Sequence, residues 1–286
     1  MERYDCFSNC VFCVIYYDIS YVQRDVKKMN HVVSFSSGLS SALTAVRVLN
    51  KYPDALLVFM DTLFEDQDNY RFMNDFENKF NVKILRLSDG RNPYEVSRAQ
   101  HVIPNSRVAP CTKRLKIEVF RKYLKSLEGD TTIYIGYDFT ELHRCESTSR
   151  NYESLGYKVD YPLLWKPYET RRYADIVKND WGIEPPRMYQ LGYTHANCGG
   201  RCVKQGQGDW IRTLINFPER FAEIEQWEND MRKNEVNSNY AILASQTIEG
   251  KKPLTLTEFR ERYEREHNDP VLFDLDAACV VCGTGV

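Results

Sequence analysis

A serine- and glycine-rich loop, Ser36-Ser37-Gly38-Leu39-Ser40-Ser41, has the composition of a phosphate-binding loop. An apolar run from His31 to Phe35 precedes it, and a segment with helical spacing of apolar residues follows it. The first turn of a helix has unpaired N–H groups and carries the positive end of the helix dipole. Gly38 lets the backbone approach a phosphate, and serine hydroxyls add donors. We therefore predict nucleotide binding through Ser36, Ser37, Gly38, Ser40 and Ser41; the alternative is a serine-rich turn before an ordinary helix.

The order of residues in this loop resembles the PP-loop of the ATP pyrophosphatase superfamily, whose pattern is Ser-Gly-Gly-x-Asp-Ser. No lysine follows the glycine, so the loop differs from the common Gly-x-x-x-x-Gly-Lys loop. Ser37 and Ser40 stand in place of the first Gly and the Asp of the PP-loop pattern. The branch around phosphoadenosine phosphosulfate (PAPS) reductase also relaxes this Asp. The departures leave phosphate binding in place and weaken the expectation of ATP cleavage.

Apolar runs and helical segments alternate along the middle of the chain. The expected strands are 31–35, 55–60, 83–87, 131–136 and 158–161, and the expected later helices are 68–80, 112–127 and 139–155. This alternation predicts an α/β fold with a parallel sheet and helices on both faces. We expect an N-terminal extension at 1–30, a PP-loop nucleotide-binding domain at 31–190, and a Cys-bearing, mainly helical C-terminal region at 191–286 with helices near 218–234 and 256–267.

Two further groups of residues follow expected strands and would meet the loop in one crevice. Asp61-Thr62 matches an acidic-threonine pair of the PAPS reductase-like family, which implies contact with the nucleotide; the alternative is a helix cap. Gly136, followed by Glu141 and Arg144, resembles another element of that family. Glu141 and Arg144 lie one helical turn apart, so an ordinary surface ion pair is the alternative.

A lone cysteine, Cys111, stands before an expected helix and is followed by Lys113 and Arg114. The resemblance places a Cys-x-x-Arg-like element here. A helix N-terminus and adjacent cations should lower the pKa of the thiol. Lys113 and Arg114 could hold a phosphate or sulfate. The alternative is a buried cysteine beside two solvated cations.

The late segment 193–206 reads Y-T-H-A-N-C-G-G-R-C-V-K-Q-G. It resembles the His-x-Asn-Cys-Gly-Gly-x-Cys-Val-Lys-x-Gly block of a PAPS reductase-like branch found in bacterial and phage genomes. The loop, the Glu-x-x-Arg element and this block follow one another in the family's order. The resemblance therefore covers about residues 31–286.

Four cysteines in two pairs form a candidate metal site, namely Cys198, Cys202, Cys279 and Cys282. Four thiolates suit a tetrahedral Zn²⁺ or a 4Fe–4S cluster, and spacing does not decide between them. The resemblance to adenylylsulfate reductases offers a different set, in which Cys111 joins Cys198, Cys202 and one C-terminal cysteine. The remaining alternative is a thiol or disulfide pair near the C-terminus.

The bulk properties are those of a cytoplasmic protein. Nine cysteines without a secretory leader favour metal or redox chemistry over structural disulfides. No apolar run approaches the roughly 20 residues of a membrane span, so we expect no membrane partner. The net charge of −2 makes no global case for nucleic acid, although a local basic patch is compatible with it.

The first residues carry a third cysteine group, Cys6, Cys10 and Cys13, with the spacing of a radical S-adenosylmethionine cluster. That family needs a large βα barrel after the motif, whereas here the phosphate loop follows at once. We expect a metal-binding extension or one without function. Met29 is an alternative start, which would make the first 28 residues non-native.

The resemblance implies an enzyme that binds ATP with Mg²⁺, or a PAPS-like adenine nucleotide, and cleaves ATP at the α-phosphate for sulfur transfer to an adenylated acceptor. The acceptor would be a nucleic acid or a small molecule, and a homodimer is an open alternative. A true PAPS or adenylylsulfate reductase is the second interpretation, although the tail around Cys279 lacks the family's Glu and His. A nucleotide-sensing or zinc-stabilised binding module is the third.

Overall fold

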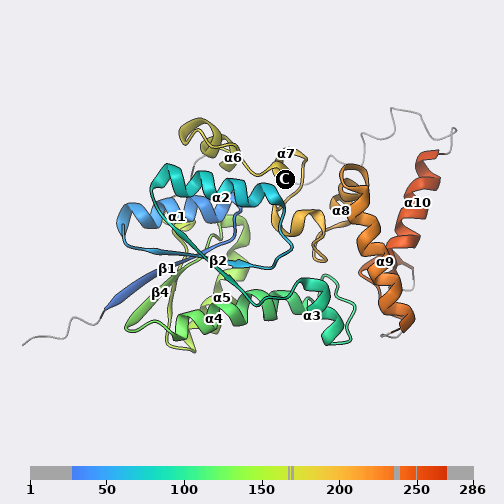
Figure 1. The fold of residues 1–286 in the computed structure, drawn as a ribbon, viewed down its shortest axis with the longest axis horizontal. Coiled ribbons are helices and arrows are strands. Elements are labelled where there is room, and N and C mark those ends of the chain that lie inside the picture. The colour runs from blue at the N-terminus through green and yellow to red at the C-terminus, as the bar shows by residue number, and fades with distance from the viewer. Residues whose placement is uncertain (1–27, 167, 169–170, 235–238, 249, 269–286) are drawn as a thin grey trace, which may run out of the picture.

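A five-stranded parallel sheet lies at the centre of the molecule (Figure 1). The computed structural model describes residues 28–166, 168, 171–234, 239–248 and 250–268. The strands are β1 (Met29–Phe35), β2 (Leu56–Asp61), β3 (Ile84–Ser88), β4 (Asp130–Tyr134) and β5 (Lys158–Asp160). They pair in the order β3-β2-β1-β4-β5. The predicted α/β fold is confirmed, and the chain reverses its direction of winding between β1 and β4, where such sheets bind ligands.

Helices cover both faces of the sheet because neighbouring residues of each strand point to opposite sides. Val33 and Leu57 pack toward α1 (Leu39–Lys51) and α2 (Gln67–Phe80). Their neighbours Val32 and Val58 pack on the other side. That side is covered by α4 (Glu118–Lys125) and α5 (Leu142–Glu153). Burial of each such side chain contributes about 1.5–3 kcal/mol, so the alternation fixes which helix covers which face.

Shorter helical segments connect these layers. The helix expected from Thr112 begins as a π-helix, and this wider turn is a local form that recurs at functional sites. A capped helix, α3, was not expected from the sequence. The segments are α3 (Pro93–Ala99), η1 (Thr112–Ile117), η2 (Phe139–Glu141), η3 (Pro162–Leu164), α6 (Tyr173–Asp175), η4 (Ile176–Asp180), α7 (Arg187–Gln190) and η5 (Asn197–Gly200).

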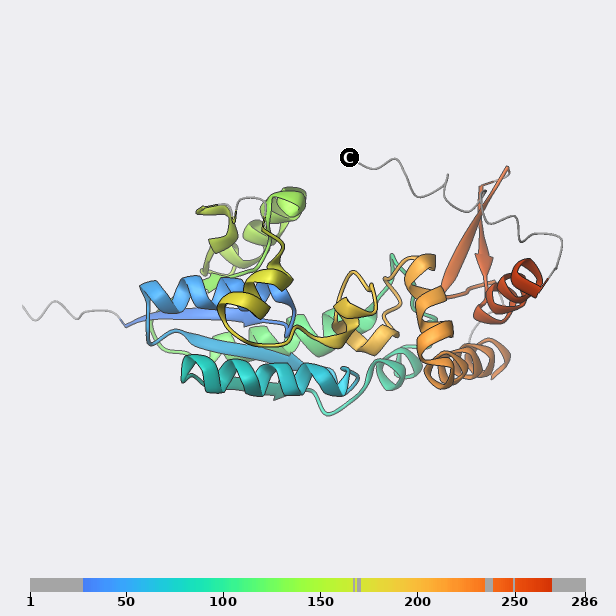
Figure 2. The same cartoon turned by 90° about the horizontal axis from the view of Figure 1, so that it is seen from above.

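The C-terminal part forms a smaller unit beside the sheet, with a core of its own (Figures 1 and 2). Its elements are α8 (Gln207–Asn216), α9 (Pro218–Asn234), β6 (Leu243–Thr247), β7 (Gly250–Leu254) and α10 (Leu256–Asn268). The two expected helices are present, but the antiparallel hairpin β6–β7 was not expected. The buried Glu228 of α9 links the hairpin and α10 to its own helix: its carboxylate accepts from the N–H of Ile242, just before β6, and from the N–H of Leu256, at the start of α10. None of the described helices combines the length and apolar character needed to cross a membrane.

The end of β4 approaches the first turn of α1 so closely that only glycine fits. A Cβ on Gly136 would lie 2.9 Å from the carbonyl oxygen of Ser40 and 3.0 Å from the hydroxyl of Thr44. The carbonyl belongs to the helix backbone, which cannot move aside cheaply. Gly136 therefore allows the segment after β4 to lie directly against the first turn of α1, next to the serine-rich loop.

Replacing Gly136 by alanine should lower the free energy of unfolding by about 1–3 kcal/mol, because the added methyl overpacks a backbone contact. Urea unfolding followed by circular dichroism measures the change. Gly208→Ala in α8 is the matched control, since its Cβ would meet Arg212 only at 3.5 Å. That control should be neutral or stabilised by up to about 1 kcal/mol through helix propensity. Equal losses in both variants would contradict the packing argument.

Candidate functional site

The N-terminus of α1 has no side-chain cap. Gly38 occupies the cap position without a side-chain hydrogen bond, and the first turn contains no acidic residue. In contrast, Asp66 caps α2 and Asn92 caps α3. The Leu39 N–H has one weak partner, the hydroxyl of Tyr189 at 3.4 Å. The first turn of α1 thus offers N–H donors and a positive dipole end to an anion.

The serine hydroxyls give the loop its shape. The Ser41 hydroxyl accepts from the N–H of Ser36 at 3.0 Å and donates to the carbonyl of Gly38 at 2.9 Å. Ser37 has a left-handed backbone with φ of 58°, and its hydroxyl donates to the Ser36 carbonyl at 2.6 Å. These bonds hold the loop in one conformation before any ligand binds. Three of the predicted phosphate contacts therefore already have partners inside the loop.

The predicted pair Asp61-Thr62 lies at the carboxyl end of β2, and neither residue caps a helix. The Asp61 carboxylate accepts from the N–H of Leu63 and the hydroxyl of Tyr70, both at 2.8 Å. Thr62 is buried and contacts Glu65 at 3.2 Å. The cap alternative was wrong because the cap of α2 falls later, at Asp66.

Glu65 is a buried carboxylate that sequence reasoning missed. Its side chain is fully buried, and it accepts from the backbone N–H of Cys198 at 2.9 Å and from the amide of Asn69 at 3.3 Å. The ammonium of Lys116 on η1 lies 3.8 Å away. Burial by itself disfavours this ammonium, but the negative charge of Glu65 and the electrostatic effect of the neighbouring cysteines together outweigh it and raise the pKa of Lys116. The sequence contains no signal for this buried position, because a glutamate in a loop is usually exposed to solvent.

Three cysteines lie near enough to Lys116 to influence its pKa. Cys198 and Cys202 share a hydrogen bond, which lowers the pKa of Cys202 to about 6 and, together with burial, raises that of Cys198. Burial raises the pKa of Cys111, and the nearby Cys202 raises it further. The predicted low-pKa thiol at Cys111 was therefore wrong. The cation beside it, Lys116, is shared with Glu65 and the other thiols.

The cysteine block folds through a run of left-handed residues. Cys198, Gly199 and Gly200 have φ values of 57°, 54° and 81°. This conformation costs a non-glycine residue roughly 1–2 kcal/mol, so Cys198 is held there by its neighbours. A Cβ on Gly199 would lie 2.8 Å from the guanidinium of Arg220, which explains the glycine after Cys198. The strained turn brings the Cys198 N–H to Glu65.

Asp66 fixes the cysteine block to the sheet. Its fully buried carboxylate accepts from Arg187 through two nitrogens at 2.8 Å and from Arg220 at 2.8 Å. Arg220 also donates to the carbonyl of Gly199 at 2.9 Å. Burial would raise the pKa of Asp66, but the hydrogen bonds from Arg187 and Arg220 outweigh it and hold the pKa below its usual value. One carboxylate therefore joins α2, α7, α9 and η5.

The predicted metal site is described only in part. Cys198 and Cys202 are neighbours, whereas Cys279, Cys282 and the N-terminal Cys6, Cys10 and Cys13 lie outside the described residues. Within the described part of the chain, no three His, Cys, Asp or Glu side chains are grouped so that they could hold a metal ion.

The other predicted residues lie on η1, η2 and α5. Glu141 and Arg144 form the ion pair that their spacing predicts, and the Arg144 guanidinium lies 4.2 Å from the centre of the Tyr137 ring. Arg114 of η1 pairs with Glu118, the first residue of α4, at 2.8 Å. The Lys113 side chain is exposed.

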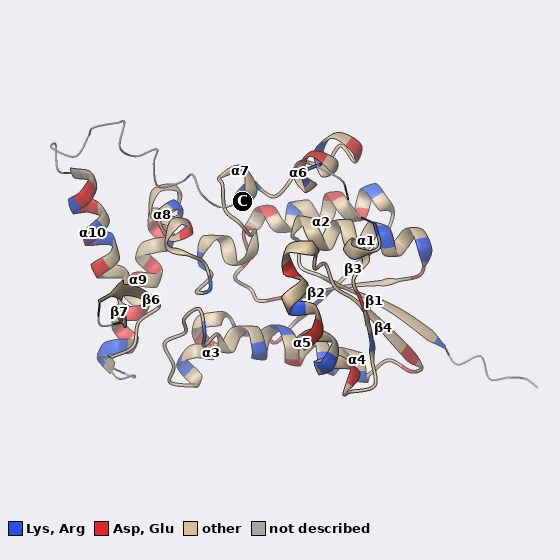
Figure 3. Cartoon of the chain, turned by 180° about the vertical axis from the view of Figure 1, so that it is seen from behind, with Lys and Arg blue, Asp and Glu red and all other residues tan. Residues whose placement is uncertain are grey.

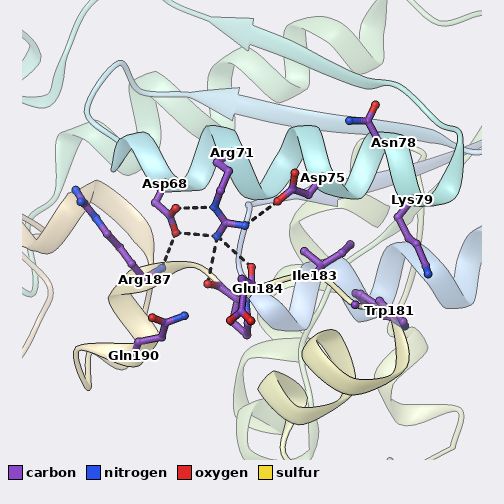
Figure 4. Close-up of a pocket in the computed structure, with 12 residues that line it drawn as sticks. Asp68, Arg71, Asp75, Asn78, Lys79, Trp181, Ile183, Glu184, Arg187 and Gln190 are labelled. Carbon is purple, nitrogen blue, oxygen red and sulfur yellow. Dashed lines mark hydrogen bonds and ion pairs between the residues drawn. The ribbon is translucent and has the colours of Figure 1, made fainter.

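A groove of about 590 Å³ runs between α2 and residues 181–190, and it contains none of the predicted site residues (Figure 4). Arg71 bridges it, with ion pairs to Asp68 at 2.6 Å and Asp75 at 2.7 Å. Arg71 also donates to the Glu184 carbonyl at 3.0 Å. These contacts use the guanidinium of Arg71 to join α2 to the segment 181–190, so the groove has a structural role.

Known proteins confirm the resemblance for the first part of this site. Residues 30–141 match the family model described as the phosphoadenosine phosphosulfate reductase domain. The matched segment contains the serine-rich loop, Glu65 and Cys111, while the cysteine block follows it. The first four strands of the sheet, apart from Met29 at the start of β1, lie within the segment that matches this domain.

Individual relatives are distant. Two uncharacterized proteins of Methanocaldococcus jannaschii are each 23% identical, in alignments of 223 and 209 positions that cover 75% and 68% of this chain. The chain spans 44% and 47% of their lengths. A crystal structure of phosphoadenylyl-sulfate (PAPS) reductase from Candida auris, in complex with phosphate, aligns with a TM-score of 0.42 at 16% identity. It covers 57% of this chain and 78% of that one.

Replacing Asp66 by asparagine should destabilise the protein by about 3 kcal/mol at neutral pH, because two arginines lose a buried counter-charge. The folded pKa of Asp66 lies below its ordinary value of 3.8. Its stabilisation is therefore complete above about pH 5 and is lost as the pH falls through the folded pKa. The difference in free energy of unfolding between the wild type and Asp66→Asn, measured in urea, should shrink below about pH 4.

Asp75→Asn is the control, since it removes a half-exposed partner of Arg71. Exposed pairs contribute about 0–1 kcal/mol, so this variant should stay close to the wild type. If Asp66→Asn lowered the free energy of unfolding no more than Asp75→Asn does, the buried carboxylate of Asp66 would not be holding Arg187 and Arg220 against α2.

Proposed function

We propose that this chain binds an adenine nucleotide with its phosphates on the N-terminus of α1, cleaves it at the α-phosphate, and so activates an acceptor for sulfur transfer. The observation that carries this proposal is the uncapped N-terminus of α1 behind the preformed Ser36–Ser41 loop. It lies in the segment that matches the PAPS reductase domain, at the winding reversal of the sheet.

The chemistry needs an anion site beside a source of sulfur. The N–H groups of α1 would neutralise the phosphates while the acceptor attacks the α-phosphorus and pyrophosphate leaves. Mg²⁺ would stabilise the charge that develops on the leaving group, and Asp61 is the oxygen ligand that we assign to it. A sulfur nucleophile then displaces AMP from the acceptor. Cys111, half-buried at the start of η1, is the residue that we assign to carry that sulfur.

Reduction of a sulfonucleotide is the second candidate, favoured by the description of the matched domain. In that reaction a thiol attacks the sulfur of PAPS and adenosine 3′,5′-bisphosphate leaves; a second thiol then releases sulfite as a disulfide forms. The pair Cys198 and Cys202 contains two neighbouring thiols. However, the sequence around Cys279 lacks the Glu and His of the reductase tail, Glu-Cys-Gly-x-His. We therefore place this reaction second.

Gly38→Asp tests the nucleotide site directly. An aspartate cap would occupy the helix N-terminus with its own negative charge, so ATP affinity should fall at least tenfold while the helix gains a cap. Titration calorimetry measures binding, and the release of pyrophosphate from ATP or of sulfite from PAPS identifies the reaction.

Gly38→Asn is the matched control, with the same shape and capping ability but no charge. Both variants meet the Tyr189 hydroxyl equally, at 3.1 Å from the Cβ. The aspartate variant should bind ATP more weakly than the asparagine variant while unfolding at a similar temperature. Equal ATP binding by the two would refute the phosphate site. Binding without pyrophosphate or sulfite release would leave a nucleotide-sensing module.

A metal at the cysteine block is a further part of the proposal. The soft thiols of Cys198 and Cys202, joined by Cys279 and Cys282, would suit Zn²⁺ or an iron–sulfur cluster. The proximity of Cys198 to Cys202 supports this donor chemistry, whereas Cys111 is not grouped with them as a third ligand. A zinc ion would stabilise the fold; a cluster would supply electrons or sulfur.

Protein purified without oxygen should contain about one zinc, or about four iron atoms with sulfide, per chain. Cys202→Ser should remove most of this metal because a neutral hydroxyl replaces a thiolate ligand. Cys145→Ser, in α5, should keep it. Elemental analysis and the absorption spectrum measure both. A wild-type protein without metal, or equal retention in the two variants, would show that these cysteines are not ligands.

A further inference from the structure

Positive charge is concentrated in a short part of this acidic chain. Residues 91–125 contain nine lysines and arginines and two glutamates, whereas the net charge of the whole chain is −2. This part comprises α3, η1 and α4. Figure 3 shows Lys and Arg recurring along α4, on the side of the sheet opposite α1 and α2.

Four of these cations form a basic stripe, defined here as Arg114, Arg121, Lys122 and Lys125. Steps of seven and four residues, from Arg114 to Arg121 and on to Lys125, bring side chains to the same side of a helix. Arg121, Lys122 and Lys125 line a shallow groove of about 320 Å³ together with Glu118. The stripe is therefore a continuous surface feature.

The charges of the stripe are poorly compensated. Arg114 pairs with Glu118, and Arg91 pairs with Asp89, so the nearby carboxylates are occupied. The exposed ammonium groups of Lys122 and Lys125 have no carboxylate partner in the described part of the chain. Like charges on adjacent turns repel each other, and a bound polyanion would remove that cost.

The length of the stripe indicates a polymer of phosphates rather than a single anion. The twelve residues from Arg114 to Lys125 extend about 16 Å along a helix axis. Phosphates of one nucleic-acid strand recur about every 3.4 Å along a duplex, so the stripe spans roughly five of them. A mononucleotide would contact only a small part of this surface.

We propose that the basic stripe is a docking surface for a nucleic-acid strand, which it binds through the phosphate backbone. Binding at this surface requires no chemistry at the serine-rich loop. The stripe begins three residues after Cys111, so a bound strand would extend toward the thiols. The binding of the strand does not depend on the proposed function. Only its role as the acceptor of sulfur rests on that function.

Fluorescence anisotropy of the full chain with a labelled 20-nucleotide single-stranded RNA, between 50 and 200 mM salt, tests this inference. The wild type should bind, with affinity falling steeply as salt rises. Lys122→Glu with Lys125→Glu should weaken binding at least tenfold and reduce the salt slope by about 0.7 for each lysine. Both side chains are exposed, so the variant should keep its unfolding temperature.

Lys79→Glu with Lys83→Glu is the matched control, since it changes the net charge equally at the end of α2 and beyond it. It should weaken RNA binding less than twofold. Absence of binding by the wild type, equal losses in the two variants, or binding to phosphatidylserine vesicles in place of RNA would each overturn the inference. ATP binding by the Lys122/Lys125 variant should be unchanged. If the Gly38 variants showed that ATP does not bind at the loop, the RNA-binding result would still stand, because it tests a different surface.

Discussion

Two adjacent buried carboxylates, Glu65 and Asp66, hold the site together. Both side chains are fully buried. A charge without water is costly unless cations and N–H groups surround it, so each carboxylate dictates the positions of its partners. Glu65 gathers Lys116 and the backbone of Cys198, and Asp66 gathers Arg187 and Arg220. The loop after β2 thereby determines where later parts of the chain lie.

The candidate site is consequently composite. The serine-rich loop and Cys111 belong to the segment that matches the PAPS reductase domain, whereas Cys198 and Cys202 belong to a block more than 50 residues beyond its end. Tyr189, which contacts the first turn of α1, also follows that segment. The C-terminal unit is joined to the site through Arg220 of α9. Its position is therefore coupled to the cysteines.

Much of the fold was predictable because buried side chains recur every second residue in a strand and every three to four residues in a helix. The alternation of Val32 with Val33, and of the apolar runs with helical segments, indicated a parallel sheet covered on both faces. The hairpin β6–β7 was missed because its central residues are polar and its two lysines at 251 and 252 resemble a loop. The serine-rich loop was found because its chemistry depends on local backbone geometry.

By itself, the sequence determined the local features: the phosphate loop after β1, the order of strands and helices, and the spacing of Glu141 and Arg144. Each depends on residues within a few positions of one another. Tertiary structure alone decided that Cys111, Cys198 and Cys202 lie near enough to Lys116 to influence its pKa, and that burial raises the pKa of the Cys111 thiol. Burial and electrostatics act between residues that are close in space, and sequence distance does not encode that closeness.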